Sequence, residues 1–256
     1  RRTMGLSAIP LARTKVYIER VQQLLAGETV EWDFESQRRK IKFLNPDLGL
    51  INLEDEIPLW VSAFGPKAMK LAAELDAGWL NFGINGADKA LESMQQAWLD
   101  AGRAPNELKS NLFFLGAVVT GDEAEDEAKL MAQGGPLTAV MFHNLADEVG
   151  AMGGRNLPVG PLSNWLGDYL SAHDQYAPED AKYLTNHRGH LMFVRPEETH
   201  ISPELVRSTT LSGTESELIT SLSALKAAGY TEVTIQLVHD HEAALEDWAK
   251  VFAQVA

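Results

Sequence analysis

The stretch that most constrains the fold covers residues 57–85, where two short apolar runs flank a predicted helix. Residues 58–63 have the apolar composition of a strand that is buried on both faces, and Gly65-Pro66 interrupts this run. Proline suits the first turn of a helix, and apolar residues recur at helical spacing as far as Leu75. Residues 79–82 form the second apolar run. The stretch therefore predicts a strand–helix–strand unit with parallel strands.

Ligands of such units bind at the carboxyl ends of the strands, where backbone N–H groups point out of the loops. In this chain the two strand ends are residues 63–65 and 81–83, and each contains a glycine. Glycine leaves room for a ligand to approach the backbone closely. The alternative is that Gly65 and Gly83 serve only tight turns between strand and helix.

The charge and the composition exclude several classes of partner. A net charge of -14 argues against nucleic acid, and the basic residues 37–40 are expected to be a solvated surface. The absence of cysteine excludes disulfides, thiolate metal sites and cysteine nucleophiles, and it fits a cytoplasmic protein. No apolar run approaches the ~18 residues of a transmembrane helix, so no membrane partner is expected.

The rest of the chain continues the alternation of strands and helices. Further core strands are predicted at 112–120 and 233–238, outer strands at 29–32 and 40–44, and helices at 13–26, 84–101 (after a loop), 121–133, 212–228 and 242–255. Residues 134–212 are less regular and are interpreted as an insertion with short helices at 137–149, 161–172 and 179–183. The alternation favours a parallel α/β fold with four core strands, half of the eight that a closed barrel needs.

Three segments, in the same order along the chain, resemble the bacterial-luciferase-like superfamily of flavin- and deazaflavin-dependent oxidoreductases. They read KVYIERVQQLLAGETVEW, PLWVSAFGPKAMKLAAELDAGWLNFG and LSGTESELITSLSALKAAGYTEVTIQLV. The resemblance implies a (β/α)8 TIM barrel formed by one domain, residues 1–256, with the insertion at about 134–212. Residues 1–5 would then follow the fourth barrel strand, so about 100 residues of the first four strand–helix units would be absent. We expect this chain alone to be inactive.

The resemblance also implies a cofactor, either FMN or the deazaflavin F420, at the carboxyl end of the barrel. Positions that match the family's phosphate-side loops are Ser62, Ala63, Phe64, Gly65, Asn81 and Gly83. The family's proton-handling residues lie in strands that have no counterpart here, so no catalytic residue can be assigned from the family.

The segment from Asn186 to His190 is a second candidate site. His187, Arg188 and His190 could bind an anionic substrate or exchange protons near neutral pH. A metal site is disfavoured because no carboxylate stands at a useful spacing, and the alternative is a purely structural loop. The two histidines would share a face only in a helix.

The remaining histidines carry weaker expectations. His239 follows the last strand and could face the cofactor, whereas His143 and His173 are expected at the surface or at the edge of the core.

The resulting hypothesis is a luciferase-like oxidoreductase or monooxygenase that acts on an unknown small organic substrate. With FMN it would activate O2, and with F420 it would exchange a hydride. A homodimer is plausible. The alternatives are a non-catalytic flavin-binding or oligomerising homologue, and an unrelated α/β hydrolase or aldolase, which the missing nucleophile disfavours.

Overall fold

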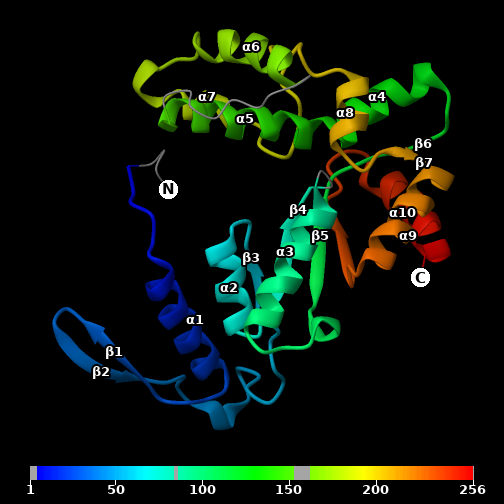
Figure 1. The fold of residues 1–256 in the computed structure, drawn as a ribbon. Helices are drawn as coiled ribbons and strands as arrows, with labels where there is room; N and C mark the ends of the chain where they lie inside the picture. Colours follow the sequence, from blue (N-terminus) through cyan, green and yellow to red (C-terminus); the bar gives the residue numbers. More distant parts are fainter. Residues whose placement is uncertain (1–4, 84–85, 153–161, 256) are drawn as a thin grey trace. The chain divides into compact units, whose positions relative to one another are not determined.

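The computed structural model describes residues 5–83, 86–152 and 162–255, which form two compact units (Figure 1). One unit comprises the described residues of Arg1–Asn81 and Ala90–Ser110. The other comprises those of Phe82–Lys89 and Asn111–Ala256. Some residues that the sequence predictions include lie outside the described residues: 1–4, 84–85 and 153–161. The last of these ranges belongs to the predicted insertion.

The first unit contains the strand–helix–strand element that the sequence predicts. Strands β3 and β4 pair in parallel, with Trp60 opposite Gly78 and Ser62 opposite Leu80. The unit also contains an antiparallel hairpin, β1 with β2. Its elements in chain order are α1 (Leu11–Leu25), β1 (Val30–Phe34), β2 (Gln37–Ile41), the 3-10 helix η2 (Pro46–Leu48), β3 (Trp60–Ser62), α2 (Pro66–Glu74), β4 (Gly78–Phe82), α3 (Ala87–Asp100) and the 3-10 helix η3 (Pro105–Glu107). Phe82 of β4 and residues 87–89 of α3 fall in the other unit, whereas Ser110 still belongs to this one.

Two tryptophans fix the β3–β4 pair. A Cβ on Gly78 would lie 2.6 Å from the Trp60 ring, so only glycine fits opposite that side chain. Trp79 is fully buried, and its indole N–H donates to the Ala63 carbonyl at 2.8 Å. The first residue after β3 is thereby held against β4.

The second unit contains two parallel strand pairs and the helices that follow them. Strand β5 pairs with β8, and the short β6 pairs with β7. The elements are β5 (Ser110–Phe114), β6 (Val118–Val119), α4 (Glu123–Gln133), α5 (Gly135–Met152), α6 (Leu162–His173), the 3-10 helix η4 (Glu179–Ala181), α7 (Tyr183–Asn186), α8 (Pro203–Thr209), β7 (Gly213–Thr214), α9 (Glu215–Ala228), β8 (Glu232–Ile235) and α10 (His241–Val255).

The prediction of one continuous strand at 112–120 is wrong, because the strand is broken between β5 and β6. A Cβ on Gly116 would lie 1.8 Å from the Leu211 carbonyl oxygen. The backbone of a segment far along the chain therefore approaches the strand at its middle. Beyond that point β6 pairs with β7, which follows Leu211 closely.

The described residues of the predicted insertion are largely helical, as expected, and α5 and α6 match the first two predicted helices. Helix α8 was not predicted, although Ser202 accepts a hydrogen bond from the Leu205 N–H at 3.2 Å and Pro203 opens the first turn. The basic residues 37–40 lie in β2, and they are exposed as predicted.

The prediction of a parallel α/β fold is confirmed. Four core strands, β3, β4, β5 and β8, are found within the described ranges. In the same ranges no helix is both long enough and apolar enough to cross a membrane.

Candidate functional site

The predicted cofactor residues of the first unit gather where β3 and β4 end. Ser62 is the last residue of β3, Ala63 is buried beneath the Trp79 indole, and Phe64 is 64% exposed. Asn81 lies near the end of β4, and its side chain is buried. An exposed aromatic ring beside buried polar and backbone groups is an arrangement that can receive a planar ligand.

Gly65 and Gly83 follow the ends of these two strands. A Cβ on either glycine would meet no atom within 4 Å, so both face open space. Gly65 has extended backbone (φ -117°) and precedes α2, whose N-terminus receives no hydrogen bond from a side-chain cap. Gly83 has φ +77°, a conformation that favours glycine, and its N–H donates to the Phe113 carbonyl at 2.9 Å. Gly83 is therefore needed for its turn, whereas Gly65 is needed neither for backbone angle nor for packing.

The corresponding ends of β6 and β7 are closed by carboxylates of the chain itself. After β6, the Asp126 carboxylate accepts hydrogen bonds from the N–H groups of Thr120 and Gly121, both at 2.8 Å. After β7, the Glu217 carboxylate accepts from the Thr214 N–H at 2.7 Å and from its hydroxyl at 2.8 Å. No anionic ligand can use these donors without displacing a carboxylate.

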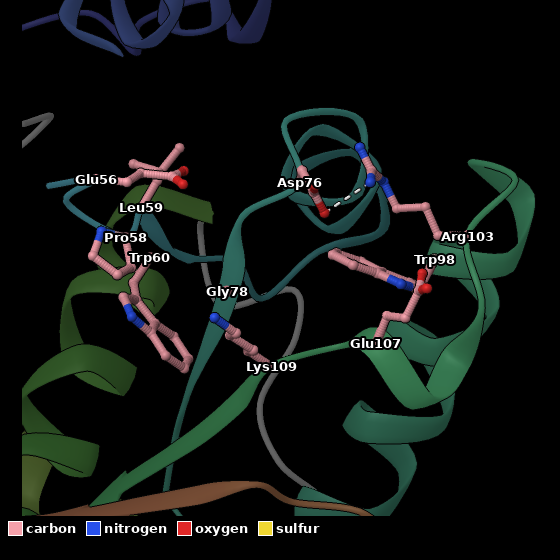
Figure 2. A pocket seen from close by; sticks show the side chains of 10 residues that line it. All are labelled: Glu56, Pro58, Leu59, Trp60, Asp76, Gly78, Trp98, Arg103, Glu107 and Lys109. Carbon is pink, nitrogen blue, oxygen red and sulfur yellow. Dashed lines mark ion pairs between the residues drawn. The ribbon is translucent and has the colours of Figure 1, made fainter. Parts of the chain in front are cut away.

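A cavity of about 490 Å³ lies in the first unit, but at the opposite ends of the strands (Figure 2). Its lining includes Trp60 and Gly78, the first residues of β3 and β4, and Lys109, which precedes β5. Because ligands of parallel α/β folds bind at the carboxyl ends of strands, its position speaks against a cofactor site.

Two polar side chains of this cavity, those of Arg103 and Asp76, are engaged in structural contacts. Arg103 forms an ion pair with Asp76 at 2.7 Å, seen in Figure 2, and donates to the Ala73 carbonyl at 2.7 Å. Its guanidinium also lies 5.2 Å from the centre of the Trp98 ring. These contacts tie the end of α2 to the segment after α3.

The second predicted site, the segment of His187, Arg188 and His190, lies in the second unit and forms a turn. Helix α7 ends at Asn186, and the His190 N–H donates to the His187 carbonyl at 3.2 Å. Gly189 has φ +77°, and a Cβ there would lie 2.6 Å from the Phe193 ring. The turn brings the Nδ1 atoms of His187 and His190 within 3.3 Å, so the prediction that they need a helix to meet is wrong.

His187 is held by a carboxylate on α5. Its Nε2 lies 2.8 Å from Asp147 Oδ2. The other oxygen of Asp147 accepts from the Asn186 amide at 3.1 Å, and the same amide donates to the His143 carbonyl at 3.1 Å. The Tyr169 hydroxyl donates to Oδ1 of the Asn186 side chain. A carboxylate beside the histidine turn thus exists, although it stands 40 positions away in sequence.

His143 is buried, so the expectation of a surface or core-edge position is wrong. It is 1% exposed, and its Nε2 lies 2.6 Å from Glu198 Oε1. Glu198 also accepts from the Arg195 guanidinium at 2.8 Å and from the Arg195 N–H at 2.7 Å. A buried charge needs partners of this kind, and here an arginine and a histidine share one carboxylate.

Burial and hydrogen bonding act in opposite directions on this cluster. Burial tends to raise the pKa of the Glu198 carboxyl, but hydrogen bonds from His143 and from the Arg195 N–H outweigh it, and the pKa is lowered. Partial loss of hydration lowers the pKa of His190, although the residue is exposed, and the neighbouring His187 and His143 lower it further. Burial also lowers the pKa of His200. The Glu198 carboxylate is therefore ionised and the His190 imidazole neutral at pH 7.

The other two sequence candidates, Arg188 and His239, are exposed. Arg188 is mostly exposed and lies 3.4 Å from Glu197. His239 is exposed, and its carbonyl accepts from the Gln133 amide at 3.3 Å. Neither joins the cluster of His143, His187 and His190.

Sequence reasoning missed His143, Asp147, Arg195 and Glu198 as members of one cluster. The spacing of His143 and Asp147, one helical turn apart on α5, was the available signal. Nothing in the local sequence links that face to Glu198.

The sequence of the chain is similar to those of known proteins. The family model described as luciferase-like monooxygenase matches residues 7–232. A 5,10-methylenetetrahydromethanopterin reductase of Archaeoglobus fulgidus is 26% identical over 234 residues, which are 88% of this chain and 59% of the relative.

Solved structures show the same fold. The coenzyme F420-dependent tetrahydromethanopterin reductase of Methanopyrus kandleri matches with a TM-score of 0.57 and 16% identity, covering 95% of this chain and 63% of that one. The oxygenating constituent of 3,6-diketocamphane monooxygenase from Pseudomonas putida, in complex with FMN, matches with a TM-score of 0.56 and 12% identity, covering 98% and 65%.

This chain therefore spans about 60% of the length of the proteins it resembles. The likeness to these structures confirms the predicted fold class, the α/β fold of luciferase-like barrel enzymes. Since the family model covers most of the sequence, the chain belongs to the luciferase-like monooxygenase family.

Proposed function

We propose that the chain is part of an oxidoreductase that binds FMN or coenzyme F420 and acts on a small organic substrate. The backbone at the carboxyl ends of β3 and β4 holds the phosphate side of the cofactor. The binding residues in this proposal are Ser62, Ala63, Phe64, Gly65, Asn81 and Gly83. Family membership supports the class of reaction. Both cofactors are proposed because one similar structure is an F420-dependent reductase and another contains FMN.

The assignment rests on a contrast between strand ends. The backbone after β3 has no side-chain cap, whereas the N–H groups at the ends of β6 and β7 are hydrogen-bonded to carboxylates. The N-terminus of α2 has no side-chain cap, and a Cβ on its N-cap residue, Gly65, would face open space. The ends of β6 and β7 are closed by Asp126 and Glu217. Pro66 has no N–H, and the Ala68 N–H donates to the Gly65 carbonyl at 2.9 Å. The donors in this proposal are therefore the backbone N–H groups of Gly65 and Lys67, beside the positive end of the helix dipole.

In this proposal the cofactor and the protein have different roles. The flavin or deazaflavin ring supplies the redox chemistry, and the protein binds and orients it. The exposed Phe64 ring gives a planar ligand an apolar surface, while Gly65 lets a phosphate oxygen approach the backbone. O2 as the co-substrate of an FMN enzyme and assembly as a homodimer are further parts of this proposal.

The test is a pair of titrations, with FMN and with F420, on the wild-type protein and on Gly65→Ala. The alanine suits the extended backbone at residue 65 and meets no neighbouring atom, so the fold should be unaffected. The added methyl group should keep the phosphate from the backbone and weaken binding about tenfold, which corresponds to about 1.4 kcal/mol.

Gly167→Ala is the matched control, because a Cβ there also meets no atom within 4 Å and Gly167 lies in α6. It should bind as tightly as the wild type. If neither cofactor saturates a protein that circular dichroism shows to be folded, the cofactor assignment is wrong. Equal binding by wild type and Gly65→Ala would sink the assignment of the site to the end of β3.

A further inference from the structure

Three histidines of the second unit converge at one point. His143 on α5, and His187 and His190 on the turn after α7, each offer a ring nitrogen, and these three atoms lie within 4.8 Å of one another. His143 is buried, His187 is half-buried and His190 is exposed. The convergence depends on Gly189, because the turn that carries His190 back beside His187 requires its positive φ.

The hydrogen bonds of His187 leave one nitrogen as an acceptor. An ionised carboxylate only accepts, so His187 Nε2 must donate to Asp147 Oδ2. In a neutral imidazole the other nitrogen then carries a lone pair, and this is Nδ1, which faces His190 Nδ1 at 3.3 Å. Asp147 is itself held by the Asn186 amide, so the ring orientation is fixed.

His143 repeats the pattern at the buried end of the cluster. Its Nε2 donates to Glu198 at 2.6 Å, which again leaves a lone pair on Nδ1. This Nδ1 is buried and has no hydrogen-bond partner among the described residues. A buried polar atom without a partner is rare in a folded protein and indicates an interaction that the chain alone does not supply.

We propose that His143, His187 and His190 bind a divalent cation of the first transition row, such as Zn²⁺ or Co²⁺. Histidine ligands of metals characteristically donate their second ring N–H to a carboxylate, as His187 does to Asp147 and His143 does to Glu198. Imidazole suits zinc, cobalt and nickel, whereas magnesium and calcium prefer oxygen. Three protein ligands leave a fourth position for water.

The distances are close to those of a bound site. Bonds of about 2.1 Å in tetrahedral geometry put ligand nitrogens roughly 3.4 Å apart, near the 3.3 Å between His187 and His190. The exposed His190 ring can rotate about its side-chain bonds to reduce the wider separations. The cation would connect α5 to the turn after α7.

The proposed metal site shares no residue with the proposed cofactor site, and the proposal does not depend on that site. None of the three histidines belongs to the strand ends of β3 and β4. Loss of cofactor binding in Gly65→Ala and loss of metal binding in a histidine variant are therefore independent results.

The test is a titration of the protein, free of any polyhistidine tag, with Co²⁺, followed by its visible absorption and by calorimetry. We expect one Co²⁺ per chain, displaced by Zn²⁺, and a rise in Tm with Zn²⁺. His187→Gln and His190→Gln should each weaken the binding by about 100-fold or more. Asp147→Asn, which removes a positioning group, should weaken it by about 10- to 100-fold.

His241→Gln is the matched control, since His241 is exposed and lies outside the cluster. It should leave Co²⁺ binding unchanged. Circular dichroism will show that each variant is folded, and His190→Gln is the safest because His190 is exposed. Absence of saturable binding at micromolar Co²⁺, or equal binding by wild type and His190→Gln, would overturn the proposal.

Discussion

Replacing Glu198 by glutamine should destabilise the protein by about 3 kcal/mol. The Glu198 carboxylate is 2% exposed and is shared by the Arg195 guanidinium and the His143 ring. Arg195 is 1% exposed, so the substitution removes its buried counter-charge and leaves only the partly exposed Glu197, 3.5 Å from its Nε. Breaking a buried ion pair by removing one partner costs about 3–5 kcal/mol, and the lower end applies because glutamine keeps the shape and one acceptor.

The assay is urea unfolding at pH 7, followed by far-ultraviolet circular dichroism. Glu197→Gln is the matched control, because Glu197 is the neighbouring residue, lies 3.5 Å from Arg195 Nε and has a side chain that is 37% exposed. It should cost less than about 1 kcal/mol, as partly solvated ion pairs do. Equal losses for the two variants would refute the claim that burial makes Glu198 the essential partner.

The lowered pKa of Glu198 makes the stability of the protein depend on pH. The pKa of Glu198 in the folded protein lies below its ordinary value of 4.5, so ionised Glu198 stabilises the fold above that value. This contribution is lost as the pH falls through the lowered pKa. The stability difference between wild type and Glu198→Gln should therefore shrink below pH 4.5.

Three further predictions concern the second unit. Gly116→Ala should cost at least about 3 kcal/mol in urea unfolding, since a Cβ would lie 1.8 Å from the Leu211 carbonyl; a loss under 1 kcal/mol would contradict that approach. Asp126 has a lowered pKa because backbone hydrogen bonds outweigh its burial, so the advantage of wild type over Asp126→Asn should vanish as the pH falls below 3.8; a constant difference would argue against the bonds. Glu217→Ala should cost about 1 kcal/mol by removing the cap of α9, and an unchanged unfolding midpoint would show that the cap contributes nothing.

The elements that local sequence determines were predicted well. Gly65-Pro66 and the apolar runs around it predicted β3, α2 and β4, because proline, glycine and hydrophobic spacing act within a few residues. Helix α8 also has a local sequence signal for its start, Ser202 followed by Pro203, although the helix was not predicted from the sequence.

The features that sequence could not predict depend on contacts between distant segments. The break in the strand at Gly116 is caused by the carbonyl of Leu211, and no local pattern reports that approach. Burial of His143 requires Glu198, which lies 55 positions away. A histidine that looks like a surface residue on an isolated helix thus becomes the buried end of a charged cluster.

The central claim, that the carboxyl end of β3 and the start of α2 bind the cofactor phosphate, is tested most directly by hydrogen exchange. Amide exchange should be measured with and without saturating FMN or F420. Slower exchange at residues 63–69 with the cofactor is the predicted result. Protection confined to the opposite strand ends around Trp60, Gly78 and Lys109, with none at residues 63–69, would contradict the account.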